Sequence, residues 1–251
     1  MVSNALLADL PANLIGKVRT ARELTRDRDP ILDDGHIVTG IAGFDTVLDG
    51  GLRRGSMVEL IGGRSTGRFS LVMATLATLT GRGEPAALID LGDGLDPAHA
   101  RDCGIDLERL LWVRPRTVRE AVACTEPILG TGISLVVIDL GLAPLPGGRG
   151  NEAAWLRLAR AARDQHVALL VSSPYRVAGT ATEQVVRAQA RRPRWHGGGE
   201  TPCLLDGLAN QLESLKRRGH AGHARAHTHW VSPTAIPTTD DAQVIPFPLA
   251  S

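Results

Sequence analysis

Apolar and polar positions along the middle of the chain form blocks that predict alternating strands and helices. Short, almost wholly apolar runs indicate buried strands, whereas longer stretches with apolar residues every three or four positions indicate helices. The strands are expected at residues 57–62, 85–92, 110–113, 134–140 and 167–173. The helices between them are expected at residues 68–80, 96–104, 117–130 and 151–165. Buried strands that alternate with helices predict an α/β fold, in which helices cover both faces of a parallel sheet.

Two of these helices begin with recognisable capping residues. Asp96 precedes Pro97, and an aspartate followed by proline is typical of the N-cap and first position of a helix. Gly104 follows the same helix as its expected terminator. Asn151 is the expected N-cap of the last helix in the series.

The N-terminal part of the chain is expected to be an amphipathic helix followed by a linker. Residues 11–26 carry apolar side chains at helical spacing, with basic residues between them. Pro30 and Gly35 then interrupt the pattern, so residues 1–35 are expected to be separate from the core. A helix on such a linker can dock on its own core or on a neighbouring protein. Its candidate partner-binding residues are Leu14, Ile15, Val18 and Leu24.

The pattern changes toward the C-terminus. Residues 185–195 alternate charged and apolar positions, as a half-exposed strand does. Residues 204–219 carry leucines at helical spacing, which by periodicity alone favours a helix. The last part of the chain, residues 232–251, is polar and rich in proline and is expected to be disordered. The core is therefore expected to span residues 36–231.

Composition narrows the class of protein. The chain has 251 residues, of which 43% are hydrophobic but only 3% aromatic, so aliphatic side chains must fill the core. A formal net charge of +1 provides no overall field that attracts nucleic acid. The three cysteines form no C-x-x-C pair and are expected to be reduced thiols. The N-terminal residues lack a secretory signal and no apolar run is long enough to span a membrane, so a soluble, cytoplasmic protein is expected.

The most informative short motif is GGRSTGRFS, at residues 62–70. A phosphate-binding loop follows the pattern G-x-x-x-x-G-K-[ST], in which the backbone cradles phosphates, the lysine reaches the outer phosphates and the hydroxyl binds Mg²⁺. Gly62 and Gly67 keep the glycine spacing, but Arg68 replaces the lysine and Phe69 replaces the hydroxyl residue. The motif keeps the loop and lacks two groups that act on a nucleotide.

Three longer segments resemble the core of the RecA recombinases in order and spacing. The first is TGIAGFDTVLDGGLRRGSMVELIGGRSTGRFSLVMATLATL, the second is LIDLGDGLDPAHARDCGIDLERLLWVRP, and the third, SLVVIDL, resembles the strand that carries the Walker B acid. The resemblance covers roughly residues 38–175 and extends more loosely to about residue 231. It implies a RecA-like core with antiparallel strands toward the C-terminus, in which residues 204–219 form a strand that follows a hairpin.

The resemblance also identifies what the sequence lacks. Active RecA-like proteins carry a glutamate that activates water two residues after a strand-end aspartate; here Asp90 is that aspartate and Gly92 takes the glutamate position. Asp93 follows, but strand alternation turns it to the other face. Asp139 keeps the Walker B position without a hydroxyl partner for Mg²⁺. The loss of base, lysine and metal ligand predicts a protein that is not an enzyme and uses no cofactor.

The former nucleotide site is expected to persist as a scaffold. An ion pair between Arg68 and Asp139 is expected to hold the loop against the Walker B strand. Nucleotide binding without hydrolysis is the alternative, because an arginine can also pair with phosphate. The residues of this degenerate site are Gly62, Gly67, Arg68, Phe69, Gly92 and Asp139.

Three places in the sequence are candidates for binding nucleic acid. The resemblance implies a long DNA-binding loop after the last parallel strand, but Pro174 follows that strand at once and the loop is short. The loop at residues 141–152 is poor in basic residues. A basic cluster later in the chain is expected to be a solvated or protein-contacting surface, with weak binding of single-stranded DNA beside Trp195 as the alternative. The cluster consists of Arg187, Arg191, Arg192, Arg194, Lys216, Arg217 and Arg218.

Four histidines near the end of the core are candidates for a metal site. No cysteine or carboxylate completes the set, so an incidental role and no metal are expected. The resemblance places the last two on one face of the final strand. These residues are His220, His223, His227 and His229.

A RecA-like core without the ATPase residues and without the long DNA loop resembles ImuA, a family of RecA-related accessory proteins encoded with translesion polymerases. That resemblance implies a non-catalytic adaptor in SOS mutagenesis, whose partners are RecA, the Y-family-like protein ImuB and an error-prone C-family polymerase. Two alternatives stay open: an ATP-dependent RecA paralogue that acts as a recombination mediator, and a module that binds single-stranded DNA.

Overall fold

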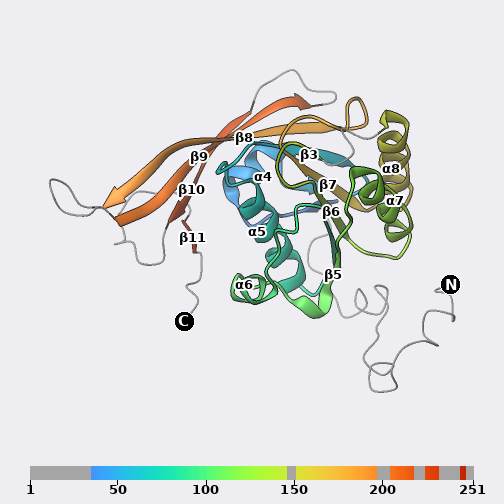
Figure 1. Cartoon of the computed structure of the whole chain (residues 1–251), viewed down its shortest axis with the longest axis horizontal. Helices are drawn as coiled ribbons and strands as arrows, with labels where there is room; N and C mark the ends of the chain where they lie inside the picture. The colour runs from blue at the N-terminus through green and yellow to red at the C-terminus, as the bar shows by residue number, and fades with distance from the viewer. Residues whose placement is uncertain (1–34, 146–150, 197–203, 218–223, 232–243, 247–251) are drawn as a thin grey trace.

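The computed structural model describes residues 35–145, 151–196, 204–217, 224–231 and 244–246, which Figure 1 draws in colour. Its parallel strands are β3 (Met57–Ile61), β4 (Ala86–Asp90), β5 (Leu110–Val113), β6 (Leu135–Asp139), β7 (Ala168–Ser173) and β8 (Gln184–His196). β9 (Leu204–Arg217) and β10 (Arg225–Val231) continue the sheet antiparallel, and β11 (Val244–Pro246) closes it parallel to β10. Within these residues the sheet has nine strands, in the order β11-β10-β9-β8-β3-β7-β6-β4-β5. The predicted α/β fold is confirmed.

Helices cover both faces of the parallel part of the sheet (Figure 1). One face carries α4 (Ala42–Leu48), α5 (Arg68–Gly81) and α6 (Pro97–Asp102), and a 3-10 turn (Leu107–Arg109) follows α6. The other face carries α7 (Val118–Leu129) and α8 (Glu152–Asp164). Two short antiparallel strands, β1 (His36–Ile37) and β2 (Leu52–Arg53), flank α4 in the chain.

Both predicted helix caps are present. The Asp96 carboxylate accepts a hydrogen bond from the Ala98 N–H at 3.0 Å, and Pro97 occupies the first position of α6. The Asn151 side chain accepts one from the Ala153 N–H at 2.9 Å. These bonds satisfy backbone donors that a helix cannot satisfy itself, which is why the two helices start there.

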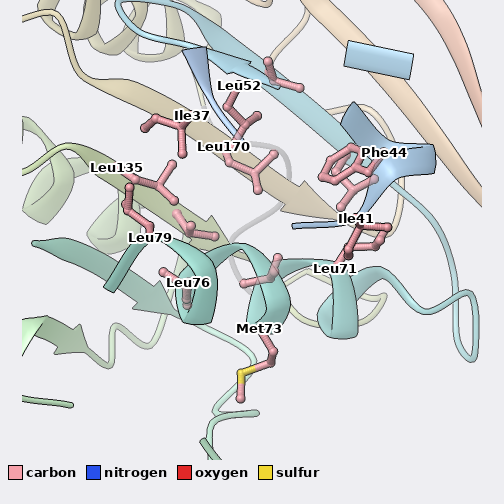
Figure 2. Packing of buried hydrophobic residues seen from close by; sticks show 14 of the residues in the cluster. Ile37, Ile41, Phe44, Leu52, Leu71, Met73, Leu76, Leu79, Leu135 and Leu170 are labelled. Atoms are coloured by element: carbon pink, nitrogen blue, oxygen red, sulfur yellow. The ribbon is translucent and has the colours of Figure 1, made fainter. Parts of the chain in front are cut away.

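The core is mainly aliphatic, as the low aromatic content predicts. Figure 2 shows Leu79 of α5 beside Leu135 of β6, and Leu71 of the same helix beside Ile41; Leu170 of β7 belongs to the same cluster. On the other face of the sheet, Trp155 of α8 is fully buried in a second cluster. The two clusters fix the parallel strands between two helical layers, and the carboxyl ends of these strands then hold the candidate site.

Within the stretch 204–219, residues 204–217 form a strand rather than the helix that leucine spacing alone favours. β9 pairs with β8 on one side and with β10 on the other, so its backbone groups are bonded within the sheet. Leu212 is buried in the core and Ser214 is buried too, a packing that an isolated helix would not provide. Tertiary pairing has overridden local periodicity here, and the strand implied by the RecA resemblance is confirmed.

Two predictions concern the ends of the chain. The N-terminal helix at residues 11–26 lies outside the described residues. At the other end, residues 244–246 form β11 beside β10, so disorder was the wrong prediction for this short stretch. Val244 and Ile245 are β-branched and suit a strand. The prediction of disorder gave more weight to the prolines around them.

Candidate functional site

The loop at residues 62–67 joins β3 to α5 at the carboxyl ends of the parallel strands. A Cβ atom added to Gly62 would lie 2.9 Å from the Ala188 carbonyl oxygen. Gly67, the N-cap of α5, has φ +75°, and a Cβ there would lie 2.5 Å from Asn210 Nδ2. Both glycines predicted from the motif are therefore required by close packing of the loop against β8 and β9.

The Arg68 side chain lies between this loop and the ends of β6 and β7. Its Nε donates to the Gly62 carbonyl oxygen at 3.1 Å, and its Nη1 donates to Asp139 Oδ1 at 2.7 Å. Nη1 also donates to the Ser172 hydroxyl, and Nη2 donates to the Gly141 carbonyl oxygen. The side chains of Arg68 and Asp139 are only 5% and 4% exposed. The predicted ion pair is thus present, and it is buried.

Asp139 is held from several sides. The Ser172 hydroxyl donates to its Oδ1 at 2.5 Å, and the Gly141 N–H donates to its Oδ2 at 3.2 Å. Burial raises the pKa of the Asp139 carboxyl, whereas the Arg68 guanidinium and the Ser172 hydroxyl act to lower that pKa. A buried carboxylate needs a countercharge, and Arg68 supplies one from within the chain.

Phe69 takes the position of the expected metal ligand and belongs to the apolar core instead. Its ring packs against the cluster that includes α5. The ring also covers Gly94 in the loop after β4, since a Cβ added there would lie 3.5 Å from the ring Cζ atom. An aromatic ring offers no oxygen ligand, so this position cannot supply the hydroxyl that the motif requires.

Two glycines meet at the position expected for the water-activating glutamate. Asp90 of β4 is paired with Asp139 of β6, and a glycine follows each aspartate by two residues. Gly92 and Gly141 therefore come together, and a Cβ added to Gly92 would lie 2.7 Å from the Gly141 Cα. The same Cβ would lie 3.2 Å from Asp139 Oδ2. In this arrangement the backbone leaves no room for a side chain at residue 92.

The neighbouring aspartates both have partners in the chain. Asp90 is buried and accepts hydrogen bonds from the Gly94 N–H at 3.1 Å and from Trp112 Nε1 at 3.2 Å. Asp93 is exposed and forms two hydrogen bonds of 2.7 Å with Arg114, which stacks on the Trp112 ring. Arg114 lowers the pKa of the Asp93 carboxyl. Asp93 lies in the loop after β4 with φ +51°, so the pairing with Arg114, rather than the predicted strand alternation, sets its direction.

The structure brings the predicted scaffold residues to one end of the sheet, but two further members of the site were missed. Ser172 and Gly141 both bond to Arg68 and to Asp139. Gly141 could have been found, because the sequence IDLG occurs at the ends of both β4 and β6. Ser172 has a weaker signal, as a polar residue at the end of an apolar strand.

Glu59 is a further buried carboxylate, and the sequence analysis did not identify it. It lies in the middle of β3, and its Oε1 accepts hydrogen bonds from the Val177 N–H at 2.5 Å and the Ala178 N–H at 3.1 Å. Burial raises the pKa of the Glu59 carboxyl, while these two backbone donors act to lower it. Glu59 thereby fixes the segment after β7, where the RecA resemblance implies a DNA-binding loop.

The basic cluster predicted from the sequence does not form one patch. Lys216 and Arg217 of β9 lie opposite the start of β8. Lys216 donates to the Thr182 carbonyl oxygen at 2.6 Å, and Arg217 pairs with Asp49. Arg192 is exposed much farther along β8. The antiparallel pairing of β8 with β9 places the basic residues of β9 opposite the start of β8, away from Arg192. Arg218 and the side chain of Arg194 lie outside what the structure describes.

The described residues support neither a metal site nor a membrane-spanning helix. Within them, no group of three or more His, Cys, Asp and Glu side chains is arranged to hold a metal ion. His227 is exposed on β10, whereas His220 and His223 lie outside the described ranges. No helix in the same residues is both long and apolar enough to cross a membrane.

Comparison with known proteins agrees with the RecA-like fold. Residues 24–151, just over half of the chain, match the family described as RecA N-terminal domain. Protein RecA of Sinorhizobium fredii is 33% identical over 121 residues, which are 47% of this chain and 34% of the relative. Protein RecA of Brucella anthropi is 34% identical over 119 residues, 47% of this chain and 33% of the relative. The match thus spans about a third of the length of these curated relatives. The chain belongs to the RecA N-terminal domain family.

Proposed function

We propose that this protein is a RecA-related accessory protein of DNA repair that does not hydrolyse ATP. The observation that carries the proposal is the buried Arg68 network. Asp139, the acid that the family resemblance assigns to Mg²⁺, already bonds Arg68 and Ser172. Phe69 presents carbon to the same region, and residue 92 has no space for a base. A nucleotide with Mg²⁺ does not fit these residues as they stand.

The specific role we propose is that of an adaptor in SOS mutagenesis, in the cytoplasm. Its partners would be RecA, an ImuB-type protein and an error-prone C-family polymerase. The support is the resemblance to ImuA, which combines a RecA-like core with loss of the ATPase residues. The relatives found by comparison are themselves named Protein RecA, and they match over only part of their length.

The catalytic part of the proposal predicts no ATP turnover above buffer background by the purified full chain with Mg²⁺ and single-stranded DNA. Arg68→Lys should stay inactive, because Phe69 and Gly92 remain. A phosphate-release assay, with an active RecA as positive control, measures this. Turnover by the unmodified protein that disappears in Asp139→Ala would favour the ATP-dependent recombination mediator instead.

The adaptor part predicts that RecA is recovered with the tagged full chain from cells after DNA damage. Leu14→Asp with Val18→Asp should abolish that recovery, because charge replaces the apolar stripe of residues 11–26. The melting temperature of the core should stay nearly unchanged, as measured by circular dichroism. Recovery of RecA with the double variant, or unfolding of the core, would contradict docking through this segment.

A further inference from the structure

One face of β8 carries a row of basic side chains beyond the helices. Ala188 of β8 is buried in the core on the α5 face, so its neighbours Arg187 and Gln189 lie on the opposite face of the sheet. Both are only half buried. Figure 1 shows that β8 continues away from α7 and α8, the helices that cover this face elsewhere.

A β-bulge lengthens this row. Between Ala190 and Arg192 the pairing with β9 shifts by one residue, so Arg191 is an extra residue on β8. Arg191 donates to Gln211, which is paired with Gln189 and shares its face. The bulge therefore keeps two consecutive arginines on one face, where regular alternation would separate them. We call Arg187, Arg191 and Arg192 the arginine row; the last two are exposed.

A cleft of about 490 Å³ adjoins the arginine row at the rim of the 62–67 loop. Ile61 and Pro174 provide apolar wall atoms, the backbone of Gly63 provides polar groups, and Arg187 and Arg191 line the side toward β8. No acidic residue is among the described residues that line it. The cleft is thus suited to an apolar group that is attached to a negatively charged one.

We propose that the arginine row and this cleft bind an extended acidic segment of a protein partner. Carboxylates of the segment would pair with the guanidinium groups, whose fork geometry suits carboxylates. An apolar side chain of the segment would enter the cleft beside Ile61 and Pro174. The inference rests on the proposed accessory role, since an adaptor requires a partner, and it adds where and by what chemistry that partner is held.

The surrounding charges favour a protein segment over nucleic acid. The row offers three guanidinium groups, and Gln211 already holds that of Arg191. Glu213 faces Arg187 across the strands, although Arg225 binds its carboxylate at 2.6 Å. Phosphate-driven binding needs many cationic contacts at physiological salt, and the net charge of +1 adds no long-range attraction. Apolar contact in the cleft strengthens a peptide complex without that requirement.

The test uses the full chain and a fluorescein-labelled peptide of about ten residues, in which Asp and Glu flank a central Leu-Leu pair. That length spans the row, because a strand rises by about 3.3 Å per residue. Fluorescence anisotropy should detect saturable binding, weaker by about tenfold or more in Arg187→Glu with Arg192→Glu. Arg192→Glu alone should weaken binding measurably while changing only an exposed side chain. Arg119→Glu, an exposed change on α7, is the matched control and should leave affinity unchanged.

Two further probes decide the class of ligand. A peptide with Asn and Gln in place of the acids should bind far more weakly than the acidic one. Failure of the acidic peptide to bind, or equal binding by Arg192→Glu and by the unmodified protein, would overturn the inference. Tighter binding of a labelled oligo(dT) that is lost in the same variants would overturn it in favour of nucleic acid. None of these assays uses RecA or ATP, so the inference can fail while the accessory role stands.

Discussion

Replacing Arg68 with alanine is expected to lower the free energy of unfolding by about 3–5 kcal/mol, the usual range for orphaning one partner of a buried ion pair. Asp139, whose side chain is only 4% exposed in the unmodified protein, would lose its countercharge. The pKa of its carboxyl would then rise further, because burial already raises it and Arg68 is the largest opposing influence. Urea denaturation at neutral pH measures the loss.

A double-mutant cycle separates the pair from its surroundings. Asp139→Ala alone should also destabilise strongly, because it leaves a buried guanidinium without its carboxylate. The double variant should be less destabilised than the sum of the two, with a coupling energy of about 2 kcal/mol. The exposed Arg114–Asp93 pair has the same 2.7 Å contact and is the matched control; its coupling should be much smaller. Equal couplings in the two cycles would contradict the role assigned to burial at Arg68.

Much of the fold could be predicted from local sequence, because the deciding interactions are themselves local. Asp96 and Asn151 cap the helices they precede. The parallel strands are buried on both faces and so appear as continuous apolar runs. β9 was harder, because its leucines at helical spacing compete with strand pairing that only distant residues of β8 and β10 provide. The bulge at Arg191 depends on the same long-range register and has no local signal.

Site residues that belong to a sequence motif could be predicted. Contacts that depend on how the strands pair with one another could not. Arg68 and Asp139 could be paired from the family resemblance, and the 2.7 Å bond is present. The meeting of Gly92 with Gly141 follows only once Asp90 is known to stand opposite Asp139. This contact gives a physical reason for the absence of a glutamate at residue 92: the Gly141 backbone occupies the volume that its side chain would need.

The same packing predicts that the ATPase residues cannot simply be restored. Restoring the family residues at all three positions, as Arg68→Lys, Phe69→Thr and Gly92→Glu together, should give no ATP turnover and should destabilise the fold by about 3 kcal/mol or more. A lysine cannot replace the four hydrogen bonds that Arg68 donates. Threonine removes a ring that packs on the core.

The contribution of residue 92 is isolated by a pair of single changes in one loop. Gly92→Ala places a Cβ 2.7 Å from the Gly141 Cα, where backbone must move, and should cost about 1–3 kcal/mol of unfolding free energy. Gly94→Ala places its Cβ at an ordinary 3.5 Å from the Phe69 ring and should cost less than about 0.5 kcal/mol. Equal stability of the two variants in urea would show that the loops yield readily. In that case residue 92 would have room for a side chain, and packing would not be the reason that a base is absent there.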